Sequence, residues 1–139
     1  MTTSHGFTVE IEPVPTPRLR FRRIGKGVST YYPGSYTKYL EAVADAYAGP
    51  DFGEVPLYVE IRVSLPRPKS HYGTGKNQHK VKDSAPEKPT TRADVDNYAK
   101  GILDALTGVA YADDRQVVQL SIEKRWGAPF VQVFIQEHE

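Results

Sequence analysis

The fold is decided by the stretch Leu57-Tyr-Val-Glu-Ile-Arg-Val-Ser-Leu65, in which apolar and polar residues alternate. A period of two predicts a β-strand with one face against a core. Toward the N-terminus, the same alternation predicts strands over Phe7–Pro13 and Arg18–Arg22. Ile24–Tyr32 is predicted as a loop, and a helix follows it with Ser35 as the N-cap residue.

Toward the C-terminus, apolar residues at helical spacing predict a helix over Asp94–Leu106. Alternating runs then predict strands over Val118–Trp126 and Phe130–Gln136, joined by a turn at Gly127. The order is ββαβαββ, and we expect the consecutive strands at both ends of the chain to pair as hairpins. This pattern predicts a single α+β domain over residues 1–139, with two helices on a mixed sheet.

The segment between the central strand and the second helix, about residues 66–93, has few apolar residues. It is rich in Lys, Pro, Gly, Ser and His. A loop of this length is unusual in a compact domain and is more often functional or disordered. We predict a basic, flexible loop within the domain rather than a linker between domains.

Composition excludes several classes of protein. The chain of 139 residues contains no cysteine, which removes disulfide scaffolds, thiol nucleophiles and cysteine zinc sites. The apolar runs are too short to span a membrane, and the N-terminus does not resemble a signal peptide. No glycine-rich loop precedes a helix with a lysine, so no nucleotide cofactor is expected. We expect a soluble, cytoplasmic protein without membrane contact.

The net charge of +1 conceals a strong segregation of charge. Of the 18 basic residues, five lie between Pro17 and Lys26 and seven lie between Pro66 and Arg92. A run of charge is usually only a solvated surface. Here aromatic residues are interleaved with the cations, and cations that contact phosphates beside aromatics that stack on bases are typical of nucleic-acid binding. The residues predicted to contact DNA are Arg18, Arg20, Arg22, Lys69, His71, Tyr72, Lys76, Lys80, Lys82 and Lys88.

Four acidic residues are candidates for chemistry. Asp94 and Asp96 are two apart at the start of the second predicted helix, where an extended chain directs both carboxylates to one side. Asp96 is predicted to be the N-cap, and Lys100 falls one turn further on the same helical face. The pair Asp113-Asp114 begins the next strand, and we expect it to lie close to Asp94 and Asp96.

Converging carboxylates repel one another unless a cation neutralises them, and their hard oxygen ligands suit Mg²⁺ or Mn²⁺. Such an ion polarises a phosphoryl oxygen and generates hydroxide at neutral pH, and a nearby lysine stabilises the developing charge. Each feature also has an ordinary explanation. A helix cap is worth about 1 kcal/mol, an i,i+4 ion pair about 0.3–0.5 kcal/mol, and an Asp-Asp turn is usually solvated. The coincidence of these features with the basic loop favours a metal site.

The residues Arg92–Gly108, followed by Asp113-Asp-Arg-Gln116, resemble the signature of the RusA family of Holliday junction resolvases. The family pattern is Asp-x-Asp-Asn-x-x-Lys, then Asp-Ala-Leu, a glycine and Asp-Asp-x-Gln, and every position is met. The resemblance extends over roughly residues 13–126. Ala93 stands where a proline is common in the family, and Tyr98 where a leucine is common, so the departures concern helix entry and packing.

The resemblance implies a homodimeric, Mg²⁺-dependent endonuclease that resolves four-way DNA junctions by paired symmetric nicks, with Mn²⁺ as a substitute metal. It implies that Asp94, Asp96 and Asp114 are catalytic metal ligands, that Asp113 shares or replaces the part of Asp114, and that Lys100 is the essential lysine. Tyr72 is a candidate for the family's aromatic wedge. Family members are frequently carried by phages, which implies a location in the bacterial host cytoplasm.

Two other functions fit the same residues. One is a related nuclease that cuts forks, flaps or replication intermediates with the same site. The other is a non-catalytic DNA-binding dimer whose aspartates only cap and solvate.

Overall fold

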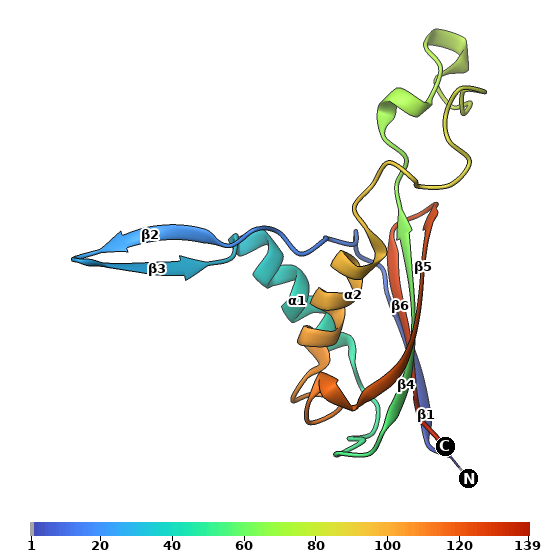
Figure 1. Ribbon diagram of the computed structural model, residues 1–139. Coiled ribbons are helices and arrows are strands. Elements are labelled where there is room, and N and C mark those ends of the chain that lie inside the picture. Colours follow the sequence, from blue (N-terminus) through green and yellow to red (C-terminus); the bar gives the residue numbers. More distant parts are fainter. Residues whose placement is uncertain (1) are drawn as a thin grey trace.

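Two helices lie on one face of a four-stranded mixed sheet, and a two-stranded arm extends away from them (Figure 1). The computed structural model describes residues 2–139. The strands are β1 (Ser4–Val9), β2 (Arg20–Ile24), β3 (Gly27–Tyr31), β4 (Leu57–Leu65), β5 (Val117–Trp126) and β6 (Phe130–Glu137). The helices are α1 (Gly34–Ala46) and α2 (Val95–Leu106), with 3₁₀ turns at Lys69–His71, Gly75–Asn77 and Asp114–Gln116. The predicted class, α+β with two helices and a mixed sheet, is confirmed.

Strand β4 is the centre of the main sheet, in the order β1-β6-β4-β5. Its alternating apolar residues Val59, Ile61 and Val63 are completely or almost completely buried against the helices, as the sequence pattern predicts. Strand β4 pairs in parallel with β5 and antiparallel with β6. Because β4 and β5 are parallel, the chain between them must cross over the sheet, and α2 is the returning element.

The prediction that consecutive strands pair as terminal hairpins is wrong. Strand β1 pairs with β6, from the other end of the chain, and β5 is separated from β6 by β4. The connection after β5 crosses the end of β4, where the Gly127 amide donates to the Leu65 carbonyl at 2.9 Å. Alternation predicts that a segment is a strand, but pairing depends on where the crossover helix returns the chain.

The loop predicted at Ile24–Tyr32 is also wrong, because Gly27–Tyr31 forms strand β3 and pairs with β2. A two-residue turn joins the strands, and Gly25 occupies its first central position with a positive φ of 56°. Glycine adopts this conformation without steric cost, as in type II′ hairpin turns. The β2–β3 hairpin, called the arm below, projects from the body of the molecule (Figure 1).

The helix starts differ from prediction by a residue or two. Helix α1 follows Pro33 and includes Ser35, which therefore is not its N-cap. Helix α2 has Asp94 at its N-cap position, so Asp96 lies in the first turn and the prediction that it caps the helix is wrong. Within residues 2–139, no helix has both the length and the apolar character needed to cross a membrane.

Candidate functional site

Helix α2 presents three of the predicted site residues at its N-terminal end. Asp94, Asp96 and Lys100 are all exposed, and the Asp94 side chain makes no capping hydrogen bond. Lys100 is four positions after Asp96, so the two side chains lie one above the other on the helix. Both carboxylates are therefore free to bind a ligand from solvent.

Two contacts hold the chain in place around this end of α2. The Nζ of Lys124, on β5, donates to the backbone carbonyls of Ala93 at 2.8 Å and Arg92 at 3.3 Å. The Thr16 amide and hydroxyl donate to the Asn97 carbonyl at 3.1 and 2.9 Å. These bonds tie the entry to α2 to β5 and to the segment that leads into the arm.

Asp113 lies at the other end of α2 and has a structural role. Its carboxylate accepts from the Arg115 amide at 2.9 Å and lies 3.3 Å from the Arg115 guanidinium. The backbone hydrogen bond, more than the guanidinium charge, lowers the pKa of Asp113. Gln116 completes a capping box by accepting from the Asp113 amide at 2.8 Å, and its own amide donates to the carbonyls of Gly53 and Val55. Asp113 is therefore engaged within its own turn.

Asp114 lies near Asp104, in the C-terminal half of α2. Burial raises the pKa of Asp114, and the neighbouring carboxylates of Asp104 and Asp113 raise it further. This carboxyl group accordingly lies among other acids and has no cationic partner to lower its pKa. Of the Asp113-Asp114 pair, Asp114 is the one whose carboxylate makes no local capping bond.

The expected convergence of Asp114 with Asp94 and Asp96 is not found within one chain. Helix α2 runs opposite to β5, since Lys124 contacts its start and Asp114 lies near Asp104 toward its end. From Asp96 to Asp104 the helix rises about 12 Å, at roughly 1.5 Å per residue. Throughout residues 2–139, no three His, Asp or Glu side chains form a group that could hold a metal ion.

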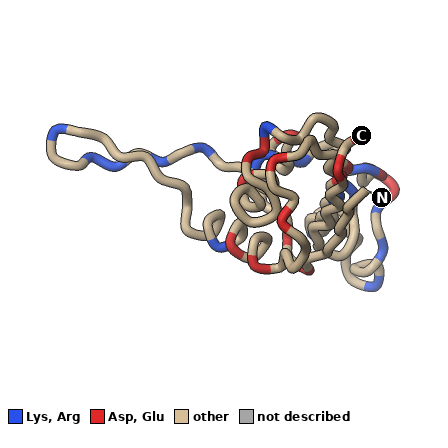
Figure 2. The backbone as a smooth tube through the Cα atoms, turned by 90° about the horizontal axis from the view of Figure 1, so that it is seen from below, with Lys and Arg blue, Asp and Glu red and all other residues tan. Residues whose placement is uncertain are grey.

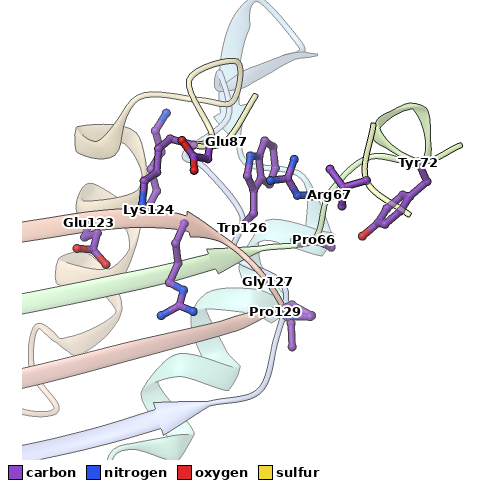
Figure 3. A pocket seen from close by; sticks show the side chains of 13 residues that line it. Pro66, Arg67, Tyr72, Glu87, Glu123, Lys124, Trp126, Gly127 and Pro129 are labelled. Carbon is purple, nitrogen blue, oxygen red and sulfur yellow. The ribbon is translucent and has the colours of Figure 1, made fainter. Parts of the chain in front are cut away.

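A cavity of about 940 Å³ lies between the loop after β4 and the ends of β5 and β6 (Figure 3). Its lining includes four cations, Arg67, Lys88, Lys124 and Arg125, against two acids, Glu87 and Glu123, together with the rings of Tyr72 and Trp126. Lys124 belongs to this cavity and also binds the Ala93 carbonyl, so the cavity adjoins the start of α2. Its charge and aromatic surface suit a nucleic-acid strand.

The loop beside the cavity is anchored at its base. The Arg67 guanidinium stacks over the Trp126 ring at 5.3 Å, and both side chains donate to the Pro86 carbonyl. His71 packs edge-on against Trp126 with ring centroids 5.1 Å apart, so its imidazole is part of this anchor. Tyr72 forms an isolated bridge with Val81, which closes the outer part of the loop. The predicted loop cations Lys69, Lys76, Lys80, Lys82 and Lys88 are exposed.

The arm carries a second set of cations (Figure 2). Arg20 and Arg22 lie two apart on β2 and share a face with Tyr31, whose ring lies 5.7 Å from the Arg22 guanidinium carbon. Arg18 precedes β2, so the strand does not align it with them as predicted. Phe21 and Val28 occupy the opposite face and are 72% and 68% exposed. Arg23 lies opposite Val28, and Ile24 lies on the face of Arg20 and Arg22, so each face of the arm carries both cationic and apolar side chains.

The sequence alone assigned no contact or role to several residues of the site. Arg67 and Trp126 hold the base of the loop after β4. Gln116 stabilises the turn before β5 by hydrogen bonds, and Asp104 lies near Asp114. The Asp-Asp-x-Gln motif marked Gln116 as fixed but gave no reason for it. The stacking of Arg67 on Trp126 joins residues far apart in the chain, and nothing in the sequence indicated that contact.

The site combines three features: an exposed acidic helix start, a cation-lined cavity beside it, and the arginines of the arm. Together they are suited to binding the phosphate backbone of a nucleic acid. The family described as Endodeoxyribonuclease RusA matches residues 10–136. A curated relative, the uncharacterized protein YqaN of Bacillus subtilis (strain 168), is 35% identical over 135 residues, covering 94% of each chain. The chain belongs to the RusA endodeoxyribonuclease family.

Proposed function

We propose that the protein is a Mg²⁺-dependent, homodimeric endonuclease that resolves four-way DNA junctions by symmetric paired nicks. The observation that carries this proposal is the family match over residues 10–136, together with the exposed pair Asp94 and Asp96 beside a cation-lined cavity. Two opposed nicks call for two active sites related by a two-fold axis, which a homodimer supplies.

Asp94 and Asp96 are the residues of this end of α2 that fit a divalent cation. Mg²⁺ is usually held by one or two carboxylates, with waters and substrate phosphate completing its octahedral shell, and both side chains are exposed. When bound, such an ion neutralises charge that develops on the phosphate during in-line attack. Mn²⁺ takes the same oxygen ligands and is the expected substitute.

The other residues bind and orient the DNA. Lys100, one turn beyond Asp96, stabilises negative charge on the phosphate that is being cut. The cations of the cavity and the arm bind the flanking phosphates, and Tyr72 and Trp126 offer surfaces for unpaired bases at the junction. Lys124 is a positioning residue, because it holds the chain that enters α2 at Ala93.

The test compares four-way, forked and linear duplex DNA, incubated with the protein in Mg²⁺ and in EDTA. We expect cutting of the four-way junction in Mg²⁺ only, with binding but no cutting in EDTA. Asp94→Asn and Asp96→Asn are expected to bind DNA without cutting it. Cutting of forks but not of four-way junctions would instead support the related nuclease, and unchanged cutting by both variants would exclude the catalytic assignment.

A further inference from the structure

Residues 16–19 form the root of the arm, and Thr16 binds this root to the first turn of α2. The Thr16 amide and hydroxyl both donate to the Asn97 carbonyl, at 3.1 and 2.9 Å. Asn97 directly follows Asp96, and its own amide donates to the Asp94 carbonyl at 3.1 Å. The backbone of Asn97 therefore links Thr16 to the residues that carry both exposed carboxylates of the helix start.

The hydroxyl group of Thr16 is itself held by a buried tyrosine. The Thr16 Oγ1 lies 3.1 Å from the hydroxyl oxygen of Tyr36, on α1. Threonine has a single hydroxyl hydrogen, and Thr16 donates it to the Asn97 carbonyl, so Tyr36 is the donor in this bond. Burial raises the pKa of Tyr36, so its hydroxyl keeps the proton that it donates. Two consecutive hydrogen bonds thus run from α1 through Thr16 to α2, and each polarises the other.

A glycine on α2 makes room for these bonds. A Cβ at Gly101 would lie 2.7 Å from the Tyr36 hydroxyl oxygen, too close for a real side chain. Glycine is unfavourable inside a helix, and the close approach of Tyr36 to the helix backbone is a physical reason for its presence here. Both helices therefore contribute to the site that holds the Thr16 hydroxyl.

The start of α2 depends on contacts from outside the helix. Asp94 occupies the N-cap position, but its side chain makes no capping hydrogen bond, and helix ends without such bonds fray. Lys124 holds the chain just before Asp94, and Thr16 holds the first turn just after it. Of these two residues, Thr16 is the one in the segment that continues into the arm.

The same segment leads to cations that suit DNA. Strand β2 of the arm begins at Arg20, four residues after Thr16 (Figure 1). No acidic residue occurs between Glu12 and Glu41, so phosphates meet no opposing charge from this part of the chain. Prolines directly precede and follow Thr16, and their rings restrict the backbone on both sides. A stiff root that is bound to α2 limits how far a phosphate on the arm can move relative to the helix start.

We propose that Thr16 is a positioning residue for DNA cleavage: it holds the root of the arm against the first turn of α2, so that DNA bound by the arm is aligned with Asp94 and Asp96. A displacement of about 1 Å between substrate and catalytic groups can lower a rate by about 100-fold, so this link acts on cleavage more than on affinity. The inference rests on the proposed nuclease function, because it concerns the geometry of that same site.

The first test compares two substitutions of Thr16. Thr16→Val removes the hydroxyl and keeps the branched shape, and we expect the single-turnover rate constant for cleavage of four-way junction DNA to fall by about tenfold. The Kd of the same DNA in EDTA is expected to stay within about twofold of wild type. Thr16→Ser keeps the hydroxyl and is expected to retain about half or more of the wild-type rate constant.

Thr37→Val is the matched control, because it removes a hydroxyl that bonds only within α1, to the Pro33 carbonyl at 3.5 Å. It is expected to cleave at the wild-type rate. All variants are measured at a temperature at which circular dichroism shows them to be folded. A folded Thr16→Val that cleaves as fast as wild type, or that loses affinity as much as rate, would overturn the positioning role. If wild type cuts no junction DNA in Mg²⁺, the proposed function itself fails.

Hydrogen exchange tests the link without cleavage. The amides of residues 98–101 bond to carbonyls at the start of α2, so their exchange measures opening of this end of the helix. We expect exchange about fivefold faster in Thr16→Val than in wild type or Thr16→Ser. Equal exchange in all three proteins would exclude the link.

The part played by the arm is tested by combining Thr16→Val with Arg20→Ala and Arg22→Ala. Substitutions at sites without shared partners normally have additive effects on free energy. If Thr16 aligns DNA that the arm holds, Thr16→Val should cost about twofold or less, rather than about tenfold, once the arginines are gone. Single-turnover cleavage at saturating protein measures both losses. An undiminished loss in the arginine-free background would overturn the proposed alignment between the arm and α2.

Discussion

The ammonium group of Lys124 lies 2.8 Å from the backbone carbonyl oxygen of Ala93, the residue that precedes Asp94. This bond joins the edge strand β5 to the start of α2, and it fixes the position of the exposed carboxylates relative to the sheet. Because Lys124 also lines the cavity of about 940 Å³, one side chain links the acidic helix start to the surface proposed to bind DNA.

Removal of this link is expected to reduce cleavage more than DNA binding. Lys124→Met keeps the length of the side chain and removes its donors, so the entry to α2 loses a charge-assisted bond worth about 1.5–3 kcal/mol. We expect the cleavage rate constant of bound junction DNA to fall by about tenfold or more. Single-turnover cleavage measures it, with Lys38→Met on the exposed face of α1 as the control. An unchanged rate constant would exclude the positioning role.

The motif glutamine Gln116 is expected to contribute to stability. Its side chain bonds to the amide of Asp113 and the carbonyls of Gly53 and Val55. Gln116→Ala removes the side-chain partner of the Asp113 amide and of the Val55 carbonyl, while the Gly53 carbonyl still accepts from the Ala112 amide at 3.0 Å. A typical hydrogen bond contributes about 0.5–1.5 kcal/mol to stability. Urea unfolding is expected to show a lower midpoint with an unchanged slope. Gln78→Ala, at an exposed loop position, is the matched control and is expected to change the free energy of unfolding by less than about 0.5 kcal/mol.

The contact between the two helices predicts the effect of a methyl group at Gly101. A Cβ there would lie 2.7 Å from the Tyr36 hydroxyl and 3.4 Å from Leu40 Cδ2. Alanine is favoured over glycine in a helix by about 1 kcal/mol, but overpacking costs about 1–3 kcal/mol. We expect Gly101→Ala to lower the melting temperature. Gly34→Ala, which has open space around the added Cβ, is expected to be neutral or stabilising, and a higher melting temperature for Gly101→Ala would contradict the packing.

The arginines of the arm are expected to set part of the salt dependence of DNA binding. Arg20→Ala with Arg22→Ala removes two cations from one face of β2. If both contact phosphates, the slope of log affinity against log salt should become shallower by about 1.8, at roughly 0.9 per phosphate contact. Fluorescence anisotropy with labelled junction DNA across a salt series measures this slope. A variant with the wild-type slope would show that the arm does not contact the phosphates.

Individual residues show how much of the candidate site the sequence alone predicted. Asp94, Asp96 and Lys100 fall on one helix within seven positions, and the helical period places them together. Asp113 and Asp114 are also adjacent in sequence, yet their roles differ, because the capping box engages Asp113 and leaves Asp114 beside Asp104. Two contacts distinguish these roles: Gln116 donates to the Gly53 carbonyl, and Asp114 lies near Asp104. The spacing of the motif does not indicate either contact.

The sequence by itself determined the elements whose periodicity is local. Alternation predicted β4, helical spacing predicted α2, and the motif from Asp94 to Gln116 predicted the family. Only the tertiary structure decided which strands pair, that Gly27–Tyr31 completes an arm, and that Asp114 lies at the far end of α2 from Asp94. The physical reason is that the spacing of apolar residues shows only which face of a strand or helix is buried. Which strands pair, and which acidic side chains come together, depends on the direction in which a crossover helix returns the chain.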